Sequence, residues 1–351
     1  MKRVVLLCAF ALLGAASVAG ARTGAGGPAG TDFHAPLNCS TKPTAQQLLS
    51  YKVPKAKKRY QISLMEVSLN GYYYVLLAYG AEQAAKQAGV DLRITAASGY
   101  TTPAIQLQQA EDVISKGTDG VVFAPVDING SVPAVNKFKA RKIPVVQVST
   151  QVNSPYPYTV MQDDYLMGKA LADQMHKLAP KGGEGIFMAG PSNATWSRKR
   201  VAGFEDQVKA KYPDMKVVDA PTSLVDPGEA LTKLTASLQA HPKITWLASV
   251  DYSLPVPQAI PSPYNKLPYA TMGFDPNTQK AVQGGFVKTT LPTDAYYMGY
   301  LGVGTVVGLL NGQEEPRVQC TPYLPGITKA NATSTWAQKQ LYPASYKPKT
   351  G

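Results

Sequence analysis

The strongest constraint in this sequence is a repeated alternation of short β-rich runs with amphipathic stretches of helical length, which begins at Tyr60. In its first half, strands are predicted over 61–67, 92–97, 120–124 and 144–149, with helices over 73–88, 102–116 and 130–140. The alternation then restarts, with helices over 165–178, 197–211 and 227–240 and strands over 185–189, 215–220, 244–249 and 269–273. Helices of this length between strands favour parallel βαβ crossovers. We therefore predict an α/β chain with two doubly wound domains.

The first 21 of the 351 residues predict a secretory signal peptide. Lys2 and Arg3 precede an apolar run from Val4 to Leu13, and small residues follow through Ala19–Ala21, where we expect cleavage. A run of about ten apolar residues is too short to cross a bilayer core of about 30 Å as a helix. We therefore expect the mature chain in the periplasm.

Residues 22–59 form an N-terminal extension rich in Gly, Pro, Ala and Lys, with one short helical candidate over 45–51. Removing the signal changes the formal charge from +12 to +10, because it takes away two cations and no anion. The charges are spread along the chain, and no helix-turn-helix, zinc finger or aromatic-basic repeat accompanies them. We therefore expect a solvated surface and no nucleic-acid partner.

The stretch 295–313 is uncharged for 19 residues and contains five glycines. Its length alone is compatible with a membrane span. The glycines, and its place after a long soluble array, favour instead a buried helix that packs closely against a neighbour.

Two cysteines remain after the signal, Cys39 and Cys320. In an exported chain an isolated pair favours a disulfide over a metal site, because no histidine or cysteine neighbours supply further ligands at metal spacing. Such a bridge would join the extension to a segment near the C-terminus. It requires the two residues to lie close together, and the sequence leaves this point open.

Ligands of open α/β sheets bind in the crevice beyond the carboxyl ends of the strands. The loops that follow the predicted strands are therefore the candidate binding segments. In the first array these are 68–74, 98–100, 125–127 and 149–151, and in the second they are 190–196, 251–253 and 274–276.

An ordered set of motifs resembles the type I periplasmic solute-binding proteins, particularly their ribose-binding-like branch. The aromatic pair Tyr73-Tyr74 opens a helix, and further matches follow in the family order at 117–127, 143–146, 162–168, 198–204 and 273–275. The resemblance covers about residues 60 to 312. It implies two Rossmann-like lobes joined by a three-segment hinge, with crossings near Gln162, Thr293 and Cys320. The N-terminal lobe would hold 60–162 and 294–320, and the C-terminal lobe and tail 163–293 and 321–351.

The same resemblance implies a sugar-binding site. Tyr73 and Tyr74 fall where the family stacks aromatic rings on a sugar, although packing at the helix start is the alternative. Asp164, Arg200 and Asp275 fall where polar groups bind sugar hydroxyls, since a carboxylate accepts from two hydroxyls and a guanidinium donates in a planar fork. An ion pair between Arg200 and Asp275 is the alternative for these two residues.

The chain also departs from the sugar-binding pattern. Ser149-Thr150 stands where the family carries Asp-Arg, and Val250 replaces an Asn beside Asp251. Thr293 replaces a Gln, and Gly71 replaces the Asn before the aromatic pair. These departures indicate a smaller or less hydroxylated ligand. The full set of candidate ligand-binding residues is Tyr73, Tyr74, Tyr100, Asp127, Ser149, Thr150, Asp164, Trp196, Arg200, Asp251, Asp275 and Thr293.

A second resemblance, to TorT-type periplasmic sensors, spans nearly the whole mature chain. It rests on the segments 55–60, 79–85, 90–92, 98–100, 188–194 and 343–348. It implies binding of trimethylamine N-oxide and contact with a sensor histidine kinase. A methylated nitrogen favours aromatic faces, and the candidates are Tyr72, Tyr73, Tyr74, Tyr100, Trp196, Tyr252, Tyr296 and Tyr297.

The sequence offers little support for an enzyme. Its three histidines, His34, His176 and His241, lie away from the strand-end loops, and no phosphate loop, nucleophile elbow or metal-binding helix motif occurs. We expect a non-catalytic, monomeric binding protein without a cofactor. Its first expected ligand is a sugar or polyol delivered to the membrane permease of an ABC transporter. The alternative is a methylated amine oxide sensed together with a histidine kinase.

Overall fold

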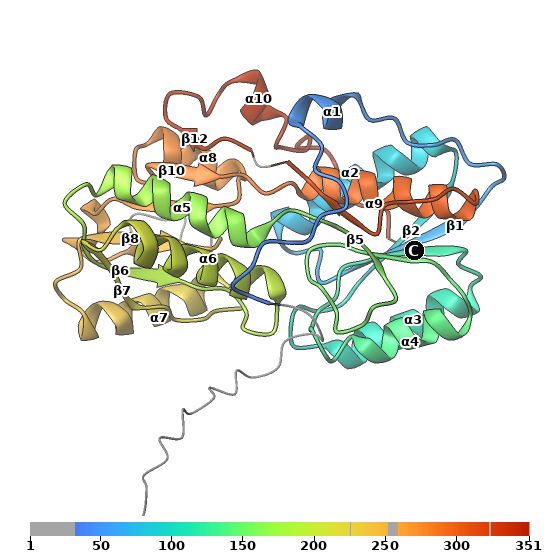
Figure 1. Cartoon of the computed structure of the whole chain (residues 1–351), viewed down its shortest axis with the longest axis horizontal. Coiled ribbons are helices and arrows are strands. Elements are labelled where there is room, and N and C mark those ends of the chain that lie inside the picture. Colours follow the sequence, from blue (N-terminus) through green and yellow to red (C-terminus); the bar gives the residue numbers. More distant parts are fainter. Residues whose placement is uncertain (1–31, 225, 252–258, 323, 351) are drawn as a thin grey trace, which may run out of the picture.

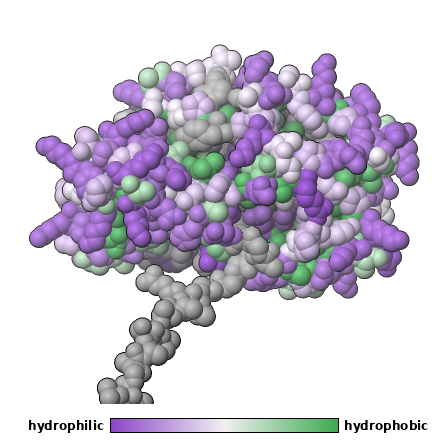
Figure 2. Space-filling view, viewed as in Figure 1, coloured by the Kyte–Doolittle hydropathy of each residue, from purple (hydrophilic) through white to green (hydrophobic). Residues whose placement is uncertain are grey.

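The computed structural model describes residues 32–224, 226–251, 259–322 and 324–350, so the predicted signal peptide lies outside the described residues. The chain forms two six-stranded sheets, each covered by helices on both faces, and the two units lie side by side (Figure 1). The face seen in Figure 2 is mostly hydrophilic, with apolar residues in small patches between polar ones. The predicted α/β class with two doubly wound units is confirmed.

The N-terminal sheet has the order β11-β5-β4-β3-β1-β2, and all of its pairings are parallel. Its strands are β1 (Gln61–Glu66), β2 (Asp91–Ala96), β3 (Gly120–Phe123), β4 (Val145–Gln147), β5 (Tyr158–Met161) and β11 (Val318–Cys320). Helices α2 (Tyr72–Ala88) and α9 (Ala295–Leu310) cover one face, and α3 (Pro103–Ser115) and α4 (Val132–Ala140) cover the other.

The C-terminal sheet has the order β12-β10-β9-β8-β6-β7 and is parallel except for β12. Its strands are β6 (Gly183–Met188), β7 (Met215–Asp219), β8 (Trp246–Ser249), β9 (Tyr269–Met272), β10 (Thr289–Leu291) and β12 (Ile327–Thr328). One face carries α5 (Asp164–Leu178) and α6 (Thr195–Lys211), and the other carries α7 (Pro227–Ala240) and α8 (Pro276–Gln283). The short elements α1 (Ala45–Ser50), η2 (Tyr264–Lys266) and α10 (Thr335–Gln338) lie outside the sheets.

In each lobe, the two helices on one face of the sheet pack against each other at glycines. These pairs are α2 with α9 and α5 with α6. A Cβ atom built at Gly299 of α9 comes within 2.1 Å of the Leu77 carbonyl oxygen on α2, and one at Gly203 of α6 within 2.0 Å of the Tyr165 carbonyl oxygen on α5. The helix backbones therefore touch. The expectation of a buried, closely packed helix in 295–313 is confirmed, and among the described residues no helix is long and apolar enough to span a membrane.

The chain crosses between the lobes three times. The crossings are 162–163 between β5 and α5, 292–294 between β10 and α9, and a third between β11 and β12, of which 321–322 and 324–326 are described. Cys39 and Cys320 form a disulfide beside the third crossing, with their Cα atoms 5.7 Å apart.

The N-terminal extension is packed against both lobes from residue 32 onward. Lys199 Nζ of the C-terminal lobe donates to the carbonyl oxygens of Asp32 (2.9 Å) and Ala35 (2.7 Å). Further along, Lys57 Nζ donates to the carbonyl of Asn311, at the end of α9 in the N-terminal lobe. The extension therefore forms a strap that crosses the hinge.

The C-terminal tail forms a second connection between the lobes. After α10, Tyr342 stacks on Tyr72 at the start of α2 with ring centroids 4.2 Å apart, and the Lys349 amide donates to Glu82. The tail ends as a parallel bridge between Thr350 and Ile94 on the edge strand β2.

The contact between α5 and α6 gives a first prediction. Gly203→Ala should lower the free energy of unfolding by about 1–3 kcal/mol, because the added carbon overlaps the Tyr165 carbonyl and forces the helices apart. Chemical denaturation measures the loss. The control is Gly284→Ala at the end of α8, where the nearest atom lies 3.3 Å from the added carbon. Equal stability of both variants would contradict the close contact.

Candidate functional site

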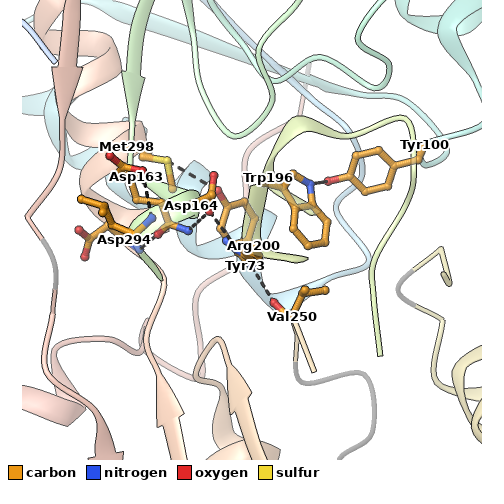
Figure 3. Close-up of polar contacts among 11 residues, drawn as sticks. Tyr73, Tyr100, Asp163, Asp164, Trp196, Arg200, Val250, Asp294 and Met298 are labelled. Carbon is orange, nitrogen blue, oxygen red and sulfur yellow. Dashed lines mark hydrogen bonds and ion pairs between the residues drawn. The ribbon is translucent and has the colours of Figure 1, made fainter. Parts of the chain in front are cut away.

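A cavity lies between the two lobes, where the carboxyl ends of their strands meet (Figure 3). It measures about 40 Å³, which is room for a few water molecules. The lobes are therefore closed on each other in this structure. The residues that line the cavity are Gly71, Tyr73, Tyr74, Tyr100, Ser149, Gln162, Asp164, Trp196, Arg200, Asp251 and Met298.

The N-terminal lobe contributes aromatic rings. Helix α2 begins directly after Gly71, so Tyr73 and Tyr74 occupy its first turn, with their rings edge to face at 5.2 Å. The Tyr74 hydroxyl donates to that of Tyr100. Burial raises the pKa of Tyr100 to about 12 and the pKa values of Tyr73 and Tyr74 well above the usual value for tyrosine. All three phenols therefore stay protonated at neutral pH and can donate hydrogen bonds.

Ser149 contributes to the same wall from the loop after β4. Its backbone has a φ of 67°, a left-handed conformation that is uncommon for residues other than glycine and that occurs often at ligand sites. The Ser149 hydroxyl lowers the pKa values of both Tyr73 and Tyr100, against the effect of burial. The turn therefore holds a hydroxyl beside the two phenols.

The C-terminal lobe contributes an ion pair and an indole. Trp196 and Arg200 lie one turn apart on α6 and face the same way. Arg200 Nε donates to Asp164 Oδ1 at 2.8 Å, Nη1 donates to the Val250 carbonyl at 2.7 Å, and the guanidinium lies 4.8 Å from the centre of the Trp196 ring. The side chains of Arg200 and Asp164 are 4% and 6% exposed, so this pair is shielded from water.

The pair continues into the hinge. Gln162 Nε2 donates to Asp164 Oδ1 at 2.7 Å, and Gln162 Oε1 accepts from the backbone amide of Asp294 at 3.1 Å. One amide side chain therefore links the first crossing to the second and orients the carboxylate of Asp164 toward Arg200.

Direct contacts hold the lobes together beside the cavity. Asn193, in the loop before α6, donates from Nδ2 to the Tyr100 carbonyl (2.9 Å), the Val126 carbonyl (3.3 Å) and Asp127 Oδ2 (2.9 Å). The backbone carbonyl of Asn193 accepts from the Ile128 amide at 3.1 Å. We call this set the Asn193 latch. Trp196 Nε1 adds a bond to the Tyr100 hydroxyl at 2.8 Å.

Eight of the twelve predicted ligand-binding residues line the cavity. They are Tyr73, Tyr74, Tyr100, Ser149, Asp164, Trp196, Arg200 and Asp251. Arg200 pairs with Asp164, so the alternative of an ion pair with Asp275 is wrong.

The other four lie outside the lining, each for a local reason. Asp127 accepts from the amides of the turn that follows it and from Asn193. Asp275 caps α8 by accepting from the Thr278 amide. Thr150, after β4, and Thr293, in the second crossing, are buried. For these four, direct ligand contact stays a prediction.

Three lining residues were absent from the predicted set. Gly71 starts α2 and Gln162 was predicted only as a hinge position. Met298 lies on α9, within the apolar run that predicted only packing, and accepts from the Tyr73 hydroxyl at 3.7 Å. Among the further aromatic candidates, Tyr72, Tyr296 and Tyr297 pack on other tyrosines, and Tyr252 lies outside the described residues.

The residues that line the cavity do not form a metal site. Among the described residues, no group of three or more His, Cys, Asp or Glu side chains is placed to hold an ion. The arrangement of aromatic faces opposite a buried ion pair is typical of a site that binds an uncharged or compact polar solute.

A model of the periplasmic binding protein domain family matches residues 64–314. Among curated proteins, the periplasmic protein TorT of Escherichia coli is 24% identical over 302 residues, covering 84% of this chain and 85% of TorT. The ribose import binding protein RbsB of Salmonella typhimurium is 26% identical over 258 residues, covering 72% and 86%. A xylitol-binding protein of Mycolicibacterium smegmatis is 27% identical over 235 residues, covering 64% and 66%.

Solved structures show the same fold. A sugar ABC transport substrate-binding protein from Bordetella parapertussis superposes with a TM-score of 0.78 at 19% identity, covering 86% of this chain and 99% of that chain. A solute-binding protein from Agrobacterium vitis with bound D-fucose gives a TM-score of 0.74 at 23% identity, covering 80% and 100%.

The Asn193 latch gives a second prediction. Asn193→Ala should weaken binding of the cleft solute by about tenfold, because two to three hydrogen bonds that hold the closed state, each worth about 0.5–1.5 kcal/mol, are lost without any change in the cavity wall. Calorimetric titration measures the affinity, and solution scattering should show a larger radius of gyration for the unliganded variant. The control is Asn129→Ala, which removes a bond to Asn153 within one lobe. Unchanged affinity in Asn193→Ala would contradict the latch.

Proposed function

We propose that this chain, which belongs to the periplasmic binding protein domain family, captures a small sugar or polyol between its lobes and delivers it to the membrane permease of an ABC transporter. The family is one of solute-binding proteins and not of enzymes, as the sequence predicts. The ribose- and xylitol-binding relatives and the sugar-bound neighbours support this ligand class.

The observation that carries the proposal is the pairing of two unlike walls across one cavity. A sugar ring has apolar C–H faces and a rim of hydroxyl groups. Tyr73 and Trp196 offer flat apolar surfaces for the faces, while Asp164 and Arg200 offer charge-assisted hydrogen bonds for the rim. Arg200 has five N–H groups, and Asp164 and Val250 accept from two of them. The remaining N–H groups of Arg200 therefore lie in one fixed plane, where they can donate to the hydroxyl groups of a sugar.

The size of the cavity bears on the mechanism. A space of about 40 Å³ is smaller than a sugar, so the solute enters an opened cleft and keeps the lobes slightly further apart than they are here. Contacts to both lobes then stabilise the closed form by the difference in affinity between the two forms. The closed surface is what a membrane partner recognises in this account.

A second candidate is a compact methylated amine such as trimethylamine N-oxide, sensed with a membrane histidine kinase. The small cavity supports it, as do four aromatic side chains in the lining and the position of Asp275, which caps a helix instead of entering the site. Similarity to TorT over most of both chains adds to this support. A cation–π contact with each ring contributes about 0.5–2 kcal/mol when desolvated.

A thermal-shift screen of the ligand-free mature protein separates the two candidates. D-ribose, D-arabinose, D-fucose and xylitol form one set, and trimethylamine N-oxide the other. A ligand at 100 times its dissociation constant stabilises the folded state by about 2.7 kcal/mol, which is a clear shift. A shift with a sugar or polyol supports the first candidate, and a shift with trimethylamine N-oxide alone overturns it.

Arg200 gives a third prediction. Arg200→Lys keeps the charge beside Asp164 but removes the planar fork, so it should weaken a sugar by more than tenfold and a methylated amine by much less. Calorimetric titration with both ligand types measures the difference. The control is Arg141→Ala at the exposed end of α4, which should change neither affinity. Equal losses for both ligand types in Arg200→Lys would contradict the sugar-binding role.

A further inference from the structure

A second and larger cavity lies at the hinge. It measures about 240 Å³ and is lined by residues of all three crossings, such as Gln162, Pro292 and Thr321, together with the disulfide and the adjoining part of the N-terminal strap. Gln162 lines this cavity and the cleft between the lobes, so it forms a shared wall. The hinge cavity is distinct from the solute cleft, because its remaining lining residues differ.

Two buried polar side chains in this cavity, Asp294 and Thr321, have no side-chain partner among the described residues except each other. Asp294 is 2% exposed and Thr321 is 6% exposed, and at most one hydrogen bond, from the Thr321 hydroxyl, reaches the Asp294 carboxylate. Buried polar atoms nearly always have a partner, and a missing one costs about 1–3 kcal/mol, more for a charged group. At least one carboxylate oxygen of Asp294 therefore lacks a donor.

The other polar groups of the cavity are already engaged. Asp163 accepts from the amides of Leu166 (3.2 Å) and Leu37 (3.0 Å), and Gln162 uses both ends of its amide. Lys42 lines the rim and is exposed. Two carboxylates against one lysine leave a net negative charge when Asp294 is ionised. This net negative charge favours a cationic ligand in the cavity.

The rest of the wall is apolar. Leu166, Met167, Pro292 and Leu324 line it. The volume of about 240 Å³ exceeds that of the roughly 150 Å³ apolar cavity that binds benzene. A ligand of the right chemistry is thus a compact apolar body that carries one charged donor.

We propose that this hinge cavity is a second solute site, which takes a small organic amine. Its ammonium group donates to the carboxylate of Asp294 and to the Thr321 hydroxyl, and its hydrocarbon body packs on Met167 and Leu324. The site goes beyond the proposed cleft function and does not depend on which solute the cleft binds.

The protonation of Asp294 adds a signature. Burial raises the pKa of Asp294 to about 7, and a hydrogen bond from the Thr321 hydroxyl acts in the opposite direction. The Tyr297 phenol on α9 also interacts with Asp294, and it stays neutral because burial raises its pKa to about 12. Asp294 is therefore neutral below this pH and charged above it, while an alkylammonium stays charged throughout. Asp163 and Lys42 are the other charged groups of the cavity. Amine binding should tighten as the pH rises from 6 to 8.

Titration of the mature protein with cyclohexylamine tests the site, followed by calorimetry and by amide chemical shifts. We expect one equivalent to bind, with affinity at least fivefold higher at pH 8 than at pH 6, and Asp294→Asn to weaken it at least tenfold. Cyclohexanol, which lacks the charge, should bind more weakly and without this pH dependence.

Further variants keep the test decisive if Asp294→Asn folds poorly. Leu166, 43% exposed, lines the cavity, so Leu166→Trp should block entry, while the matched change Ile105→Trp, at a residue 39% exposed on α3, should not. Tyr74→Ala, at a residue that lines the cleft and not the hinge cavity, should leave amine binding at the hinge unchanged.

If amine binding survives Asp294→Asn and Leu166→Trp but is lost in Tyr74→Ala, the amine lies in the cleft and the proposal is overturned. Absence of amine binding means that the cavity holds water only and also overturns it. The sugar titrations test the cleft separately.

Discussion

The buried ion pair between Arg200 and Asp164 is the interaction on which the site depends. Two charges this deeply buried persist only when their geometry satisfies both, and removing one partner costs about 3–5 kcal/mol. The geometry comes from helix packing. A Cβ atom at Gly168 would lie 2.2 Å from the Arg200 carbonyl oxygen, so the absence of a side chain there lets α6 approach α5 closely enough for the pair to form. Gln162 and the Val250 carbonyl complete the set of partners.

The second constraint is the closed arrangement of the lobes. The Asn193 latch and the Trp196–Tyr100 bond join the lobes without any ligand, while the strap and the tail connect them on other sides. The apparent affinity of a solute depends on how much of the protein is in the form that can bind it. The Asn193 latch therefore lowers the population of the open form. It also lowers the free energy that a bound solute must supply to keep the lobes closed. Affinity in this protein is set by residues beside the cavity as well as by those lining it.

Much of the fold could be predicted because strand and helix patterns are local. The predicted elements of both arrays agree with the structure to within a few residues, whereas the strands β5, β10, β11 and β12 and the helix α8 were not predicted. One long-range contact was predictable, the disulfide between Cys39 and Cys320, because an exported chain with two isolated cysteines favours it. The packing of the extension on both lobes through Lys199 and Asn311 was not predictable, since it depends on side-chain contacts between distant segments. In the site, aromatic and charged residue types were predictable, but the pairing of Arg200 with Asp164, and the capping role of Asp275, depend on side-chain geometry.

The central claim is that one solute contacts both lobes at the aromatic wall and at the ion-pair wall. Hydrogen–deuterium exchange, measured on the mature protein with each sugar, each polyol and trimethylamine N-oxide in turn, tests it most directly. The account predicts that the binding solute slows exchange at the start of α2, around Tyr73, and at the start of α6, around Trp196, at the same time. Slower exchange in only one of the two lobes, or no change with any of these solutes, would contradict it.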